Sequence, residues 1–176
     1  MDPVFTHIVA LGLSLLFLAA GLQKLRLRDS FEQVLSGYQL LPAAALALAS
    51  RVIPLVELAL AAGLAYPDTR AVAALGAALL LCLYATSIWI NLKRGNMGLD
   101  CGCQLGESKQ TISYPLVYRN ALLAGVALLL IAPQSTREVA LYDYGATGFG
   151  IAIACLLYAI ANTQIANASS FREINR

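Results

Sequence analysis

Charged residues are scarce in this sequence. Asp, Glu, Lys and Arg make up 12% of the 176 residues, and 59% are hydrophobic, whereas an ordinary soluble domain carries about a quarter charged residues. A chain of this size cannot hide so much apolar surface from water, which argues against a soluble enzyme and against a disordered protein. One histidine, His7, offers no histidine cluster for a metal, and a net charge of +2 offers no basic field for nucleic acid. The lipid bilayer is therefore the expected solvent.

Long, mostly apolar runs are abundant instead. A helix needs about 20 mostly apolar residues to cross a bilayer, and five segments meet or approach this length: residues 4–23, 42–66, 71–92, 115–132 and 145–166. The first has no basic residues before it and is too long for the apolar part of a signal peptide, which favours an uncleaved span. Polar breaks at 67–70 and 133–138 suit tight connections. We expect an all-α, polytopic transmembrane helical bundle of about five spans, one domain over residues 1–166, with a polar tail at 167–176.

A short amphipathic helix is expected after the first span. Apolar side chains recur at helical spacing on one face, at Phe31, Val34, Leu35, Tyr38 and Leu41. This pattern predicts a helix lying in the membrane interface and ended by Pro42. The alternative is that the segment extends the second span at its N-terminus.

Several polar residues are expected at one membrane face. The loops that follow the first and third spans emerge on the same side, because two crossings separate them. Ionisable groups inside a span usually face the bundle interior and pair, so Glu57 is expected to pair with Lys24 or Arg119. Arg51 and Arg119 have the alternative of extending to the lipid headgroups. The residues predicted to gather at this face are Lys24, Arg51, Glu57, Asp100, Cys101, Cys103, Arg119 and Asn120.

The Cys101-Gly102-Cys103 motif in the third polar loop is the chemical candidate. Glycine between the thiols gives the backbone freedom to bring them together. A disulfide across one residue closes a strained, reducible ring, which suits thiol exchange better than structural support. Nearby cations favour the thiolate, and Asp100 opposes it. The alternatives are binding of Cu(I) or zinc and a merely structural loop; Cys82 and Cys155, in the middle of spans, are expected to be buried and structural.

Taken together, these motifs resemble the MauE/DoxX-like redox-associated membrane proteins of methylamine utilisation. The resemblance rests on residues 21–25, 31–42, 54–57 with Gly63, 100–103 with Gly106, and 119–120, in that order. It implies a bacterial inner-membrane protein that assists maturation of the disulfide-rich small subunit of periplasmic methylamine dehydrogenase. The implied partner is a thioredoxin-like protein, MauD. We expect Cys101 to attack and Cys103 to resolve the mixed disulfide.

Three questions stay open at this stage. An architectural likeness to vitamin K epoxide reductase-type enzymes suggests a quinone as electron acceptor, but no motif marks a quinone pocket. A small-solute or metal-ion transporter and a non-catalytic assembly factor are the alternative functions. The topology is contested as well: ten of the twelve Lys and Arg residues share the cysteine face, which predicts a cytoplasmic location, whereas disulfide exchange belongs in the periplasm.

Overall fold

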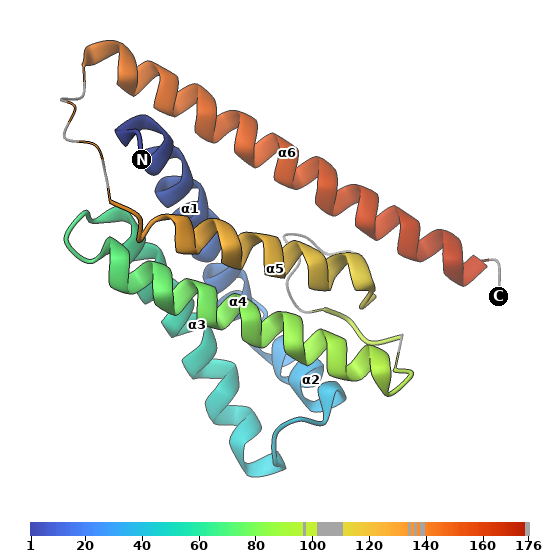
Figure 1. Cartoon of the computed structure of the whole chain (residues 1–176). Helices are drawn as coiled ribbons and strands as arrows, with labels where there is room; N and C mark the ends of the chain where they lie inside the picture. The colour runs from blue at the N-terminus through green and yellow to red at the C-terminus, as the bar shows by residue number, and fades with distance from the viewer. Residues whose placement is uncertain (97, 102–110, 134, 136, 138–139, 175–176) are drawn as a thin grey trace.

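The computed structural model describes residues 1–96, 98–101, 111–133, 135, 137 and 140–174, with side chains to residue 168. The described part is built from six helices and contains no named strand, which confirms the all-α prediction (Figure 1). In chain order the helices are α1 (Pro3–Arg26), α2 (Arg28–Tyr38), α3 (Ala43–Ala65), α4 (Arg70–Lys93), α5 (Tyr114–Leu129) and α6 (Leu141–Ile174).

Each of the five predicted apolar runs coincides with a helix. Within the described residues, α1, α3, α4 and α6 are long and apolar enough to cross a membrane, and α5, with 16 residues, is a shorter apolar helix. The chain is therefore a multi-pass membrane protein. Helix α6 continues past the predicted end of the last span, through Ile174.

The core is built from small side chains. On α4, Ala73, Ala74, Ala77 and Ala78 are all buried at helical spacing, and α4 packs against α3 and α5. Small residues let helix backbones approach closely, which matters in lipid, where the hydrophobic effect does not drive helices together. A Cβ added at Gly63 would lie only 2.8 Å from the Cβ of Ala73.

Helix α2 is separate from α3. It ends at Tyr38, where Gln39 adopts a left-handed conformation with φ 51°, so the prediction that Pro42 ends it is wrong by three residues. Phe31 and Tyr38 form its buried face against the bundle. These bounds favour a distinct amphipathic helix over an N-terminal extension of the second span.

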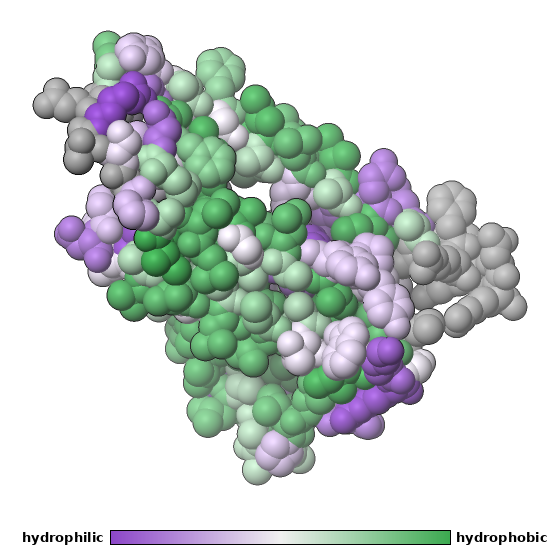
Figure 2. Space-filling model, viewed as in Figure 1, coloured by the Kyte–Doolittle hydropathy of each residue, from purple (hydrophilic) through white to green (hydrophobic). Residues whose placement is uncertain are grey.

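Helix α6 is the least integrated element. It packs mainly against α1, and the most apolar part of its candidate span is not buried against the rest of the protein at all. The two helices approach closely at Gly150, where an added Cβ would clash with Ile8. Figure 2 shows a hollow between the ridge formed by α6 and the body of the molecule.

Salt bridges join the start of α6 to the N-terminus. Arg137 lies 3.5 Å from a carboxylate oxygen of Asp2 and 3.2 Å from one of Asp143. The hydrogen bond to Asp143 raises the pKa of Arg137 above its ordinary value, so this guanidinium stays charged at every physiological pH.

The prediction that Cys82 and Cys155 are buried is wrong. Both residues are exposed, and Cys155 borders an open pocket between α1, α5 and α6. A mid-span cysteine in a membrane can therefore have apolar surroundings without being covered by protein.

Gly21 controls the spacing of α1 and α3. An added Cβ would lie 3.1 Å from the Pro54 carbonyl oxygen and 3.1 Å from Leu58 Cγ. We expect Gly21→Val to destabilise the protein by about 1–3 kcal/mol through overpacking, seen as a lower midpoint when helical circular dichroism is followed against temperature in detergent. Gly125→Val is the control, because nothing lies within 4 Å of an added Cβ there; equal midpoints for the two variants would contradict the prediction.

Candidate functional site

A buried ion pair joins α1 to α3. Lys24 Nζ donates to Glu57 Oε1, and the two side chains are only 5% and 1% exposed. Of the two cations considered for Glu57 from the sequence, Lys24 is therefore the partner. A single charge in lipid is costly, so a bonded cation stabilises an ionised carboxylate inside a span.

Tyr84 adds α4 to this pair. Its hydroxyl donates to Glu57 Oε1 at 2.7 Å and accepts from Lys24 Nζ at 3.2 Å. The Lys24 ammonium also lies over two aromatic rings, 4.8 Å from the centroid of Tyr84 and 5.4 Å from that of Phe31. A cation over an aromatic face is attracted by the ring quadrupole. The charge of Lys24, on α1, is thus balanced on several sides by residues of three other helices.

Arg119 and Asn120 approach the same place from α5. Together with the ion pair and Tyr84 they line a small cavity of about 20 Å³, which holds about one water molecule. We call these five residues the buried polar cluster: Lys24, Glu57, Tyr84, Arg119 and Asn120. The structure therefore brings together four of the residues that the sequence placed at one membrane face.

Three polar atoms of the buried polar cluster have no hydrogen-bond partner among the described residues: Glu57 Oε2, Arg119 Nε and Asn120 Nδ2. One is an acceptor and two are donors. A single water in the cavity would be offered both kinds of partner, which is the environment that holds a buried water in place.

Arg119 also reaches α6. Its guanidinium donates to Asn162 Oδ1 and lies 5.7 Å from the ring centroid of Tyr158. Tyr158 lines the small cavity as well. The polar end of α6 is thereby held against α5 through one arginine, although the rest of α6 packs mainly against α1.

Cys101 lies at one end of the bundle, among side chains that include Ile88 and Leu116, one helical turn from Tyr84 and Asn120. Its side chain is 6% exposed and belongs to an apolar group, the Cys101 cluster, which consists of Tyr38, Ile88, Leu92, Cys101, Ile112 and Leu116. An antiparallel bridge between Asp100 and Thr111, with Ile112 N donating to Leu99 O at 2.8 Å, pins both ends of the intervening loop. Cys103 lies outside the described residues.

Arg51 is not part of the site. Its side chain is exposed on α3 and lines neither of the two cavities described here, in agreement with the alternative that it extends to the headgroups. Three residues that the sequence analysis missed are Tyr84, Tyr158 and Asn162. A signal for them would have been their position on α4 and α6 relative to Glu57 and Arg119. That position depends on how the helices pack, which the sequence of a single helix does not show.

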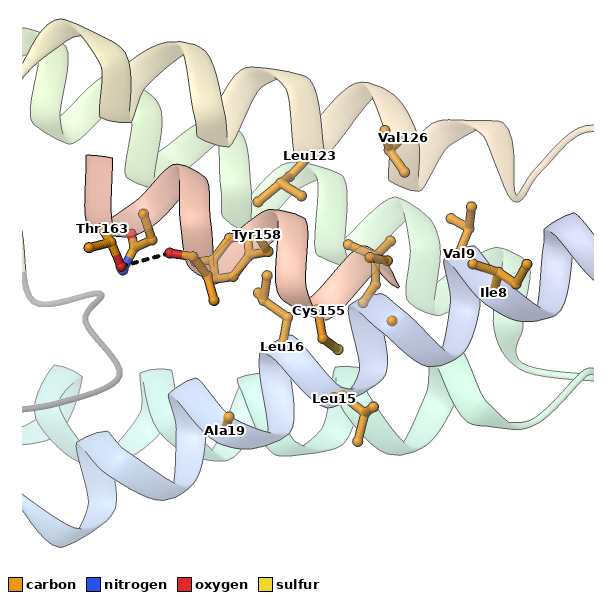
Figure 3. Close-up of a pocket in the computed structure, with 15 residues that line it drawn as sticks. Ile8, Val9, Leu15, Leu16, Ala19, Leu123, Val126, Cys155, Tyr158 and Thr163 are labelled. Carbon is orange, nitrogen blue, oxygen red and sulfur yellow. Dashed lines mark hydrogen bonds between the residues drawn. The ribbon is translucent and has the colours of Figure 1, made fainter. Parts of the chain in front are cut away.

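A larger apolar pocket opens beside the cluster, between α1, α5 and α6. Its volume is about 530 Å³, and it shares Leu16, Leu123 and Tyr158 with the small cavity. Figure 3 shows Tyr158 and Thr163 at one end of this pocket and Ile8 and Val9 at the other. Cys155 points into it from α6.

These features define a class: a multi-pass helical membrane protein with a buried polar cluster next to a cysteine-bearing loop. Comparison with known proteins makes the assignment specific. The family model for methylamine utilisation protein MauE matches residues 2–133, and the chain belongs to this family. No solved structure matches.

Three curated relatives, each named methylamine utilization protein MauE, agree with this assignment. The protein of Paracoccus denitrificans is 32% identical over 176 residues, covering all of this chain and 95% of the relative. That of Paracoccus versutus is 43% identical over 72% of this chain and 68% of the relative. That of Methylorubrum extorquens is 39% identical over 76% of this chain and 75% of the relative.

The stability of the protein should fall far more when one partner of the ion pair is replaced than when both are replaced. Glu57→Leu leaves a buried, uncompensated ammonium, so we expect destabilisation of about 3–5 kcal/mol. The double variant Lys24→Met with Glu57→Leu should recover most of it, because two apolar side chains replace the pair. Thermal unfolding in detergent measures both.

Arg51→Met is the matched control, since it removes an exposed cation from α3. We expect a change within about 0.5 kcal/mol. If the double variant is as unstable as Glu57→Leu, the prediction is wrong, because the loss of stability then does not come from the unpaired ammonium of Lys24.

Proposed function

We propose that the protein is an inner-membrane thiol–disulfide exchange protein of methylamine utilisation, acting through Cys101 and Cys103. Its partner is a thioredoxin-like, MauD-type protein, and the client is the maturing methylamine dehydrogenase small subunit in the periplasm. The observation that carries the proposal is the placement of Cys101. It is held in an apolar cluster at the end of the bundle where its loop meets α4 and α5.

The exchange itself needs no other reactant. The thiolate of Cys101 attacks one sulfur of a partner disulfide, forms a mixed disulfide and releases one partner thiolate. The Cys103 thiolate then attacks the Cys101 sulfur and releases the second partner thiolate. The partner gains two electrons, and Cys101 and Cys103 become a disulfide; the reverse sequence oxidises the partner.

The surroundings of Cys101 support this role in two ways. The bridge at Asp100 and Thr111 fixes the position of the Cys101 backbone, so the thiol is held at a defined point. Lys93 and Arg94, exposed at the end of α4, add positive potential at the same end of the bundle, and positive potential favours the thiolate.

The thiol pair should convert between dithiol and disulfide in cells. In a background lacking Cys82 and Cys155, a maleimide-linked polyethylene glycol should shift the protein only after reduction, if the pair is oxidised at steady state. Gel mobility of acid-quenched samples measures this. The Cys101→Ser variant is the control, because its remaining thiol has no intramolecular partner and labels without reductant. Full labelling of the parent protein with and without reductant, under both oxidising and reducing growth conditions, would rule out exchange.

Two other functions predict different outcomes for the same variants. A metal-binding or transport role predicts stoichiometric copper or zinc in the purified protein; among the described residues, no group of three His, Cys, Asp or Glu side chains could hold a metal. A non-catalytic assembly factor predicts that a Cys101→Ser, Cys103→Ser double variant still supports maturation of the dehydrogenase.

Topology supplies a separate test. We expect the loop carrying Cys101 to lie in the periplasm, against the prediction of the Lys and Arg distribution, because thiol exchange with a periplasmic client requires it. Insertion of a single accessible cysteine after Gly95, in a background without the native cysteines, should be labelled in intact cells by a membrane-impermeant maleimide. Labelling only after the inner membrane is permeabilised would place the loop in the cytoplasm and contradict the periplasmic assignment.

A further inference from the structure

The apolar pocket between α1, α5 and α6 is open to the lipid bilayer on one side. Helix α6 touches α1 closely at Gly150, where an added Cβ would clash with Ile8. Toward the cysteine end of the bundle the two helices separate (Figure 1), and the pocket of about 530 Å³ lies in the space between them. Because the most apolar part of α6 is not buried against protein, the molecules nearest to this opening in a membrane are lipids.

The pocket runs along α1 toward a cation. Its lining on α1 extends from Ile8 to Ala19, about 16 Å at 1.5 Å per residue. Arg26, in the last turn of α1, follows Ile8 by 18 residues, which is about five full turns of helix. Arg26 therefore projects from α1 in the same direction as Ile8, the residue that meets α6. Its side chain is exposed.

No carboxylate pairs with Arg26 in the described part of the chain. Asp29, three residues further on, is also exposed, but the two form no salt bridge there. Arg119, at the same end of the pocket, already donates to Asn162 and lies over Tyr158, so its part is to hold α6 in place. An unpaired cation at the end of a span attracts the anionic headgroups of lipids. The charge of Arg26 therefore complements a lipid phosphate.

The length of a phospholipid matches the distance from Arg26 into the pocket. From its headgroup to the middle of the bilayer a phospholipid extends about 20–22 Å, half the thickness of a membrane with its headgroup regions. Along α1 this length corresponds to about 14 residues, from Arg26 to Gly12. A chain that starts at Arg26 therefore passes Ala19 and ends inside the pocket, short of the contact at Gly150. We propose that the pocket binds one acyl chain of an anionic phospholipid and that Arg26 binds its phosphate.

The walls of the pocket suit an acyl chain. Gly12 and Ala19 line it from α1, and Ala154 and Ala159 line it from α6; their small side chains leave a channel between the two helices. Lipid chains are as apolar as this lining, so the chain alone gives no selectivity. Selection among lipids comes from the headgroup at Arg26.

A bound chain would cover the side of the bundle that lies next to the buried polar cluster. Tyr158 lines both the apolar pocket and the small cavity, so it is the only side chain of α6 between the two. The lipid then completes the wall that α6 leaves open. This role is separate from the proposed thiol chemistry, because Cys101 does not line the pocket.

Native mass spectrometry of the full chain, purified in detergent, counts the lipids bound to it. Phosphatidylglycerol and phosphatidylcholine with the same acyl chains are added at equal concentration. We expect one phosphatidylglycerol per chain, retained about fivefold better than phosphatidylcholine, the preference that one cation gives for an anionic headgroup. Arg26→Gln should remove this preference. Arg51→Gln, which removes an exposed cation from α3, is the control and should leave it unchanged.

Obstruction of the pocket tests where the chain lies. Ala159→Trp places a large side chain in the pocket and should lower retention of phosphatidylglycerol about tenfold. Ala161→Trp is the matched control: the same exchange is made two residues further along α6, at an exposed position that does not line the pocket. Nothing lies within 4 Å of a Cβ added at Gly12, so Gly12→Leu should fold normally and also lower retention.

Several results would overturn the proposal. They are the absence of a one-to-one complex, equal retention of the two lipids by the parent, and equal retention by the parent and both obstructed variants. A second protein chain bound to the parent in place of a phospholipid, and lost from Ala159→Trp, would overturn it as well. The Cys101→Ser, Cys103→Ser double variant should retain the lipid like the parent, so lipid binding and thiol exchange fail separately.

Discussion

The buried Lys24–Glu57 pair is the constraint on which the arrangement of the helices depends. In lipid neither charge has bulk water to solvate it, so each is most stable beside the other. That requirement fixes the end of α1 against the middle of α3, and Tyr84 extends it to α4. One turn away, Gly21 lies close to the Pro54 carbonyl, so the same two helices also approach closely there. A larger residue at Gly21 would separate the two helices at the level of the pair.

Hydropathy was sufficient to predict the spans, because a mostly apolar run of about 20 residues has few other stable states in a membrane. It was also sufficient to predict that Glu57 pairs with a cation. It could not choose between Lys24 and Arg119, which approach from the same end of the bundle. That choice depends on how α1 and α5 are rotated about their axes, and rotation is set by packing of side chains such as the buried alanines of α4.

The errors of the sequence analysis share a physical origin. Cys82 and Cys155 were expected to be buried because apolar surroundings in a soluble protein mean the protein interior. In a bilayer the outer surface is apolar too, and hydropathy does not separate the two. The large pocket was unforeseen for a related reason: it exists because α6 touches α1 closely at Gly150 and then diverges. The angle between two apolar helices cannot be read from the residue pattern of either helix.

The family match separates the buried polar cluster from the large pocket. It covers residues 2–133, which include all five members of the buried polar cluster and Cys101, and it ends before α6. The Paracoccus denitrificans relative nevertheless aligns along the whole chain. The cluster is thus a feature of the α1–α5 body, whereas the large pocket needs α6 as its third wall. Arg119 and Tyr158 connect the two: Arg119 lines the small cavity and donates to Asn162 of α6, and Tyr158 lines both cavities. The buried charges are therefore coupled to the position of α6 through these two side chains.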